Sequence, residues 1–260
     1  MNLIFKKDNI ESYETLWQEY LDEHLISFHY SLKVLDLLMS LNNNLFSDES
    51  FLVEENNKCI GICFLPIENS KDKLNISIAN TYIFMPLTKT KKAKKQIFTT
   101  IDKICRKYNI CKIQFSFSQF FFEEYNTLLE YGFIDTSTTT CNIKLINTKE
   151  ILWSNLRKSY KSLINSLIKN QEFGILYSNS ENRVELHNNY TGFHKNHIEI
   201  AGKVVKSELL YDKHYNLLES NLATIIAVTF KNKVIMTNYF LHNEVSVTYS
   251  SSAYDTNFDF

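Results

Sequence analysis

The sequence is poor in glycine and proline, with only 5 glycines and 2 prolines in 260 residues. This scarcity argues against glycine-rich phosphate loops, β-sandwiches with many turns and flexible linkers, and it favours long helices between regular strands. The chain also has no apolar run of about 18 residues and no apolar stretch typical of a secretory signal at its start. We therefore expect a cytoplasmic protein without a membrane span.

Cysteine is also scarce, and its number is odd: Cys59, Cys63, Cys105, Cys111 and Cys141. The five lie in apolar surroundings without paired CxxC spacing, which indicates reduced core residues rather than disulfides or a zinc site. Burial in apolar strands would raise the thiol pKa of Cys63, Cys111 and Cys141, which argues against a nucleophilic cysteine. His194 and His197 lack the further ligands that a zinc site needs, so no metal is predicted.

A strong charge of one sign is absent as well, because the formal net charge is -1. No global field therefore recruits nucleic acid or an anionic membrane. The local balance is uneven: residues 1–80 carry 6 basic and 13 acidic side chains, whereas residues 89–112 carry 9 basic and one acidic. A polyanion would bind the basic segment at residues 89–112. The alternative is that these lysines form the solvent-facing side of a helix.

Apolar residues are abundant, at 44% of the chain, and they can form substantial cores. The length of 260 residues favours two modules over one. The patterns in the first half indicate helix, three strands, helix, strand, helix and strand, in that order. The pattern restarts at residue 147, where Asn147 and Glu150 have the spacing of a capping box. We expect a mixed α/β protein with modules at 1–146 and 147–260.

The second half opens with an amphipathic helix, predicted over 148–170. Leu152, Leu156, Tyr160, Leu163 and Leu167 form its apolar face. The opposite side carries a cationic polar stripe made of Arg157, Lys158, Lys161 and Asn165. A strand at 173–178, helices at 181–199 and 207–220, and three antiparallel strands up to residue 252 follow, joined through Lys231-Asn232 and His242-Asn243.

Three blocks carry a resemblance to a known family: EYGFIDTSTTTCNIKL with ILWSNLRKSYKSLIN, FHKNHIEIAGKVVKSELLYDKHY, and VSVTYSSSAYD. Their order and spacing resemble the FemAB-type branch of the acetyltransferase-like (GNAT) transferases over residues 130–255, and residues 1–130 agree in element order. The resemblance implies tandem GNAT-like modules, each a mixed sheet flanked by helices. It also implies acyl or aminoacyl transfer, in which an amine attacks an activated carbonyl.

The sequence departs from that family in two places. The stretch MPLTKTKKAKKQ stands where the family has a glycine-containing loop for the pyrophosphate of coenzyme A. Without glycine its backbone cannot approach a pyrophosphate closely, so no cofactor site is evident, and an acyl-CoA or an aminoacyl-tRNA remains the candidate donor. The chain also ends at AYDTNFDF, where the family continues, which predicts that the second module is incomplete.

Candidate site residues come from the second module. His194 or His197 could act as a general base, and Tyr249 could supply a hydroxyl at a strand end; a core or surface role is the alternative for each. Arg157, Lys158, Lys161 and Asn165, with Ser250 and Ser251, could bind the substrate. A solvated helix face and ordinary strand alternation are the alternatives.

Two functions follow. The first is an acyl or aminoacyl transferase acting on an amine of a cell-wall or surface-glycan precursor, with tRNA as a further candidate partner. The second is a catalytically inactive binding or scaffold protein derived from such a transferase. The sequence indicates neither the donor and acceptor nor the oligomeric state.

Overall fold

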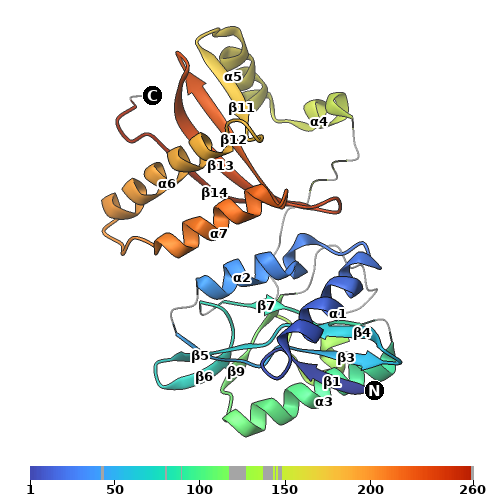
Figure 1. Cartoon of the computed structure of the whole chain (residues 1–260). Coiled ribbons are helices and arrows are strands. Elements are labelled where there is room, and N and C mark those ends of the chain that lie inside the picture. Colours follow the sequence, from blue (N-terminus) through green and yellow to red (C-terminus); the bar gives the residue numbers. More distant parts are fainter. Residues whose placement is uncertain are drawn as a thin grey trace. The chain divides into compact units, whose positions relative to one another are not determined.

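The computed structural model describes residues 1–41, 44–79, 81–88, 90–116, 127–136, 143, 145 and 148–258. The chain divides into two compact units (Figure 1). Unit 1 comprises Met1–Phe133, Glu208–Leu217 and Asn243–Ser246, and unit 2 comprises Ile134–Ser207, Leu218–His242 and Val247–Phe260. The module boundary predicted between residues 146 and 147 falls outside the described residues, so it stays a prediction.

Unit 1 combines helices with short strands. Its elements from residues 1–133 are β1 (Asn2–Phe5), α1 (Ile10–Asp22), η1 (Phe28–Tyr30), α2 (Leu32–Ser40), β2 (Leu45–Asp48), β3 (Phe51–Glu55), β4 (Lys58–Cys63), β5 (Pro66–Ser70), β6 (Lys73–Ile76), β7 (Ile83–Phe84), β8 (Leu87–Thr88), α3 (Lys91–Tyr108), β9 (Lys112–Ile113), β10 (Phe115–Ser116) and η2 (Thr127–Tyr131). Most of α7 (Glu208–Glu219) also belongs to this unit.

The strands of unit 1 form two four-stranded sheets, in the orders β1-β3-β4-β8 and β2-β5-β6-β9, and a pair of β7 with β10. Most pairings are antiparallel, but β6 with β9 and β7 with β10 are parallel. A parallel pair needs a crossover connection, and α3 lies between these strands in the sequence. A crossover helix is therefore present, as predicted. The predicted order of helix, three strands and helix is wrong, because β1 precedes α1 and eight strands of the described residues precede α3.

Helix α3 shows how the sequence sets both ends of an element. The side chain of Thr90 accepts a hydrogen bond of 3.1 Å from the backbone N–H of Ala93 and caps the first turn. Asn109 ends the helix in the left-handed conformation, with φ 51°. Ile97 and Ile101 are buried, so the basic side chains occupy the polar side, as the spacing predicts.

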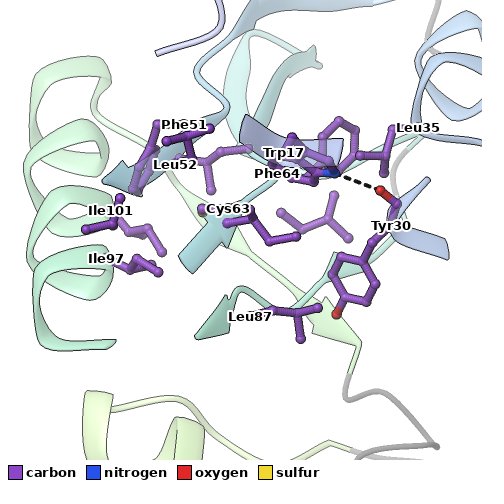
Figure 2. Packing of buried hydrophobic residues seen from close by; sticks show 14 of the residues in the cluster. Trp17, Tyr30, Leu35, Phe51, Leu52, Cys63, Phe64, Leu87, Ile97 and Ile101 are labelled. Atoms are coloured by element: carbon purple, nitrogen blue, oxygen red, sulfur yellow. Dashed lines mark hydrogen bonds between the residues drawn. The ribbon is translucent and has the colours of Figure 1, made fainter. Parts of the chain in front are cut away.

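Aromatic and aliphatic side chains from α1, α3, β3 and β4 form the core of unit 1 (Figure 2). Trp17 is fully buried, and its indole Nε1 donates a hydrogen bond of 2.8 Å to the backbone oxygen of Tyr30. Phe51 and Leu52 of β3 lie near Ile97 and Ile101 of α3 in the same view. This packing holds α1 and α3 against the strands. The cavity described below lies between the end of α1 and the first turn of α3.

Unit 2 is built around one antiparallel sheet. Its elements are α4 (Lys149–Asn155), α5 (Lys158–Lys169), β11 (Phe173–Tyr177), α6 (Arg183–Ile200), the end of α7, β12 (Ala223–Phe230), β13 (Lys233–His242) and β14 (Val247–Tyr254). The strand order is β11-β12-β13-β14. Buried and half-buried residues alternate along β12, and α6 packs against β13 and β14.

The predicted hairpins of both units are confirmed. Asn56 and Asn57 join β3 to β4, and Lys231 and Asn232 join β12 to β13. All four residues have a positive φ, between 49° and 65°. Two successive residues in this conformation form the tight turn that matches the twist of paired strands, and asparagine tolerates it better than most residues. The chain can therefore make tight turns with few glycines.

The predicted helix over 148–170 is wrong in one respect: the structure has two helices, α4 and α5. Leu156 and Arg157 are extended between them. The predicted N-cap Asn147 lies outside the described residues, and Thr148 caps α4 instead. The expected apolar face is also largely exposed, because Leu163 and Leu167 show 61% and 52% of their surface.

Both units are mixtures of sheet and helix, so the predicted mixed α/β class is confirmed. Among the helices of the described residues, none combines the length and the apolar character that crossing a bilayer requires.

Candidate functional site

Helix α6 and strand β14 bring several of the predicted site residues together in unit 2. Tyr190 links the two elements, since its hydroxyl lies 2.8 Å from Oγ of Ser251. The ring of His194 stacks on Tyr190, with centroids 5.5 Å apart. One helical turn on, the ring of His197 meets that of Tyr254 edge-on at 4.2 Å. His194, His197 and Ser251 therefore belong to one cluster.

The environment of His194 favours its neutral form. Burial lowers its pKa, and the positive charges of His197 and Lys206 lower it further. A neutral imidazole can accept a proton at physiological pH, which is what a general base requires. His194 thus combines partial burial with a lowered pKa that suits this role.

Tyr249 and Ser250 lie beside the cluster, where β14 is irregular. Tyr239 pairs with Ser251 and Phe240 pairs with Tyr249, so Ser250 is an extra residue without a partner on β13. The ring of Tyr249 packs edge-on against Phe240 at 5.6 Å. A bulge of this kind redirects side chains locally, which explains why simple alternation does not place these residues.

Tyr190 and Tyr254 are members of the cluster that sequence reasoning missed. Burial raises the pKa of Tyr190, the hydrogen bond with Ser251 lowers it, and the nearby Tyr249 raises it again. Tyr190 therefore keeps its proton and can donate a hydrogen bond. Its position four residues before His194 is a signal that could have found it, since residues four apart share a helix face.

The predicted cationic stripe lies on α5, with Arg157 at the N-cap position. Arg157, Lys158 and Asn165 are exposed, and Lys161 is half-buried. Nζ of Lys161 donates a hydrogen bond of 2.9 Å to the backbone oxygen of Ser154, which holds it near the end of α4. The substrate-binding role of these four residues stays a prediction.

A cavity in unit 1 is a feature that the sequence did not predict. It has a volume of about 390 Å³ and lies between the end of α1 with the following loop, the segment of β8, and the first turn of α3. Its lining is Tyr20, Glu23, His24, Leu25, Ile26, Met85, Pro86, Leu87, Thr88 and Lys94. The lining segments around Tyr20 and around Leu87 are far apart in the sequence, so no local pattern predicts the cavity.

Comparison with known proteins gives a fold and no sequence family. No family model matches the chain. No curated protein matches it either. A solved structure described as "Crystal structure of FemX" matches with a TM-score of 0.60 over 87% of this chain and 75% of that chain, at 10% sequence identity. The fold is similar to that of FemX.

That likeness agrees with the predicted α/β class, although the sheet of unit 2 is antiparallel rather than mixed. A match over 87% of the chain is larger than either unit alone, so it includes parts of both. The likeness to the fold of FemX therefore extends over parts of both units.

The cysteines agree only in part with the sequence analysis. Burial raises the pKa of the Cys59 thiol to about 12, and it also raises the pKa of the thiols of Cys63 and Cys105. The predicted burial of Cys111 is wrong, because this residue is exposed just before β9. Cys141 lies outside the described residues. Within the described part of the chain, no cluster of three or more metal-ligating side chains occurs.

Proposed function

We propose that the chain is a FemAB-type acyl or aminoacyl transferase that acts on an amine of a cell-wall or surface-glycan precursor. The observation that carries this proposal is the FemX-like fold, which extends over both units. The short sequence blocks of residues 130–255 that resemble the FemAB type agree with this proposal.

In the proposed reaction the amine nitrogen forms a bond to the carbonyl carbon of the donor. The carbon–oxygen or carbon–sulfur bond of the donor then breaks, and the alcohol or thiol leaves. His194 takes the proton that the attacking nitrogen loses and gives it to the departing oxygen or sulfur. Ser251 accepts a hydrogen bond from Tyr190, so its own hydroxyl hydrogen is free to be donated to the developing oxyanion. Most of the rate comes from holding the two reactants in position.

The other predicted residues have supporting roles in this proposal. Arg157, Lys158, Lys161 and Asn165 bind anionic groups of the donor or the acceptor, and Ser250 and Tyr249 line the approach to Ser251. Burial, with His197 and Lys206 nearby, lowers the pKa of His194 and so favours its neutral form. The donor is an acyl-CoA or an aminoacyl-tRNA, and the acceptor is a small molecule or a glycan precursor.

A transfer assay tests the proposal. The purified chain would be incubated with radiolabelled aminoacyl-tRNA or acyl-CoA and an extract of amine-bearing cell-wall precursors, and label in the precursor fraction would be counted. We expect transfer with at least one donor class, and a loss of about 100-fold or more in kcat for His194→Gln. His242→Gln is the matched control, because His242 is bonded to Thr224 of β12 and is not part of the cluster of α6 and β14.

The result that would overturn the proposal is saturable binding of the precursor without any transfer. That outcome would assign the chain to the alternative class of binding or scaffold proteins. Equal activity of His194→Gln and the unchanged chain would remove His194 from the mechanism while leaving the transferase activity in place.

A further inference from the structure

A second cavity lies in unit 2, where the ends of β11 and α7 meet the starts of α6 and β12. It has a volume of about 180 Å³, and serine, asparagine and threonine side chains make up most of its lining. We propose that this cavity binds a small free α-amino acid, with the carboxylate of the ligand on Arg183 and its ammonium group on Glu219.

Arg183 and Glu219 bring opposite charges to this one cavity. Arg183 is the first residue of α6 and is half-buried, and Glu219 is the exposed last residue of α7. Neither side chain forms an ion pair or a hydrogen bond with another described residue. The guanidinium and the carboxylate are therefore both available to a ligand that carries a negative and a positive group.

Each of these two charges stands at the helix end that disfavours it. A helix has partial positive charge at its N-terminus and partial negative charge at its C-terminus, so α6 repels the guanidinium of Arg183 and α7 repels the carboxylate of Glu219. A ligand carboxylate beside Arg183 and a ligand ammonium beside Glu219 would have the favourable sign at both helix ends. Charges that break a local rule of stability in this way are expected at functional sites.

Hydrogen bonds within the lining hold its shape and leave a donor for the ligand. Oγ of Ser178 accepts a hydrogen bond of 2.9 Å from the backbone N–H of Ile225. The hydroxyl hydrogen of Ser178 can still be donated to a carboxylate. The side chain of Asn179 accepts from the backbone N–H groups of Glu181 and Asn182, at 2.8 and 3.1 Å. The segment that joins β11 to α6 is thus ordered before a ligand binds, which lowers the entropy cost of binding.

The volume limits the ligand to a small molecule. At about 30 Å³ for each molecule, the cavity corresponds to about six waters, and it is below the range of about 300–1,000 Å³ typical of larger ligands. Leu218 and Ala223 are the apolar residues of the lining, and they can cover a short aliphatic side chain. Glycine and alanine meet these limits of size, charge and polarity.

This cavity is distinct from the cluster of α6 and β14. His194 lies eleven residues after Arg183 on α6, which is about 16 Å along the helix axis. A small amino acid bound to Arg183 therefore does not reach His194. The inference does not rest on the proposed transferase activity, because either can fail while the other holds.

Calorimetric titration of the full chain at low ionic strength tests the inference with two matched sets of probes. L-Alanine is compared with propionate and ethylamine, and glycine with acetate and methylamine. In each set one analogue lacks the ammonium group and the other lacks the carboxylate. We expect at least one amino acid to bind about 10-fold or more tightly than both of its analogues, because each analogue loses the hydrogen bonds of one charged group.

Two variants locate the binding. Arg183→Gln and Glu219→Gln should each weaken binding of the amino acid about 10-fold or more. Lys169→Gln and Glu185→Gln, at exposed positions outside the lining, are the controls and should bind as the unchanged chain does. Since each helix repels the charge that is removed, thermal unfolding without ligand should give an equal or higher midpoint for Arg183→Gln and for Glu219→Gln.

Four results would each overturn the inference. The first three are no saturable binding of either amino acid at millimolar concentrations, equal affinity for an amino acid and one of its analogues, and unchanged binding to Arg183→Gln or to Glu219→Gln. The fourth is a lower unfolding midpoint for both variants, because it would show that the two side chains pair with each other in solution.

Discussion

Tyr108 donates a hydrogen bond of 2.6 Å to the carboxylate of Glu49, and this contact ties the last turn of α3 to the segment between β2 and β3. The same carboxylate accepts from Lys7 at 2.6 Å and from Ser47 at 2.9 Å. Glu49 is only 2% exposed. A buried charge with this many partners is stabilising only while all of them are present.

Glu49→Gln should therefore lower the free energy of unfolding of unit 1 by roughly 2 kcal/mol at pH 7. Burial raises the pKa of Glu49, but the hydrogen bonds from Lys7, Tyr108 and Ser47 outweigh it, so the net pKa is lowered. The stability that Glu49 contributes is then present above its unfolded pKa of about 4.3 and is lost as the pH falls through its folded value. The variant should lose less stability on acidification.

Urea unfolding measured by the fluorescence of Trp17, in a Trp153→Phe background, reports on unit 1 for this comparison. Glu55→Gln is the control, because Glu55 pairs with Lys92 at the surface and such pairs contribute at most about 1 kcal/mol. Equal effects of the two substitutions would contradict a structural role for the buried carboxylate.

His29 should make the protein sensitive to mild acid. Burial lowers its pKa to about 4. A histidine in the unfolded chain takes up its proton near pH 6.5, so the unfolded state binds more protons than the folded state between about pH 6.5 and 4. The free energy of unfolding therefore falls by up to about 3 kcal/mol over this range. His29→Asn should remove this part of the loss. Unfolding curves at pH 7 and pH 4.5 would measure this difference. An equal loss of unfolding free energy in the variant and in the unchanged protein would contradict the role of His29.

Two glycines should respond to alanine in opposite directions. A Cβ on Gly61 would lie 3.0 Å from Cδ1 of Ile97 and 3.1 Å from the backbone oxygen of Leu87, so Gly61→Ala should destabilise by about 1–3 kcal/mol. Gly192 lies in α6, where an added Cβ would have no neighbour within 4 Å, and Gly192→Ala should stabilise by about 0.5–1 kcal/mol. Thermal unfolding of both variants would show whether each substitution raises or lowers the stability.

Acetyl-CoA should not bind tightly at the start of α3. The Ala93 N–H is already bonded to Thr90, and the first turn carries Lys91 and Lys92 with no glycine to let a pyrophosphate approach. Calorimetry at moderate salt should show no saturable binding in the micromolar range. A dissociation constant of about 1 μM, equivalent to about 8 kcal/mol, would reveal a site elsewhere in the chain.

The elements that sequence could predict are those with strong periodicity or clear turn residues. Helix α6 and strands β12 and β13 lie close to their predicted bounds, because their apolar pattern is regular and Lys231-Asn232 marks the turn. The break at Leu156 and Arg157 carries neither proline nor glycine, so nothing in the local pattern indicates it. Whether the Leu163 side of α5 is covered depends on tertiary packing, which periodicity alone cannot supply.

The candidate sites divide in the same way. His194, His197 and Ser251 could be found because histidines on one helix face and hydroxyls at a strand end are visible in the sequence. The cavity of unit 1 could not be found, because its walls come from the segment around Tyr20 and from the distant segment around Leu87. Contacts of this kind appear only when the chain has folded.

Unit 1 includes Glu208–Leu217 and Asn243–Ser246, and Nδ2 of Asn243 donates a hydrogen bond of 2.7 Å to the backbone oxygen of Ile26. During synthesis the ribosome releases the N-terminal residues first, and domains commonly fold in that order. Here the first unit cannot reach its final set of contacts until translation has passed residue 246. Its completion therefore depends on residues synthesised more than 100 positions after Phe133, and a fragment that ends at Phe133 would lack two of the segments that belong to it.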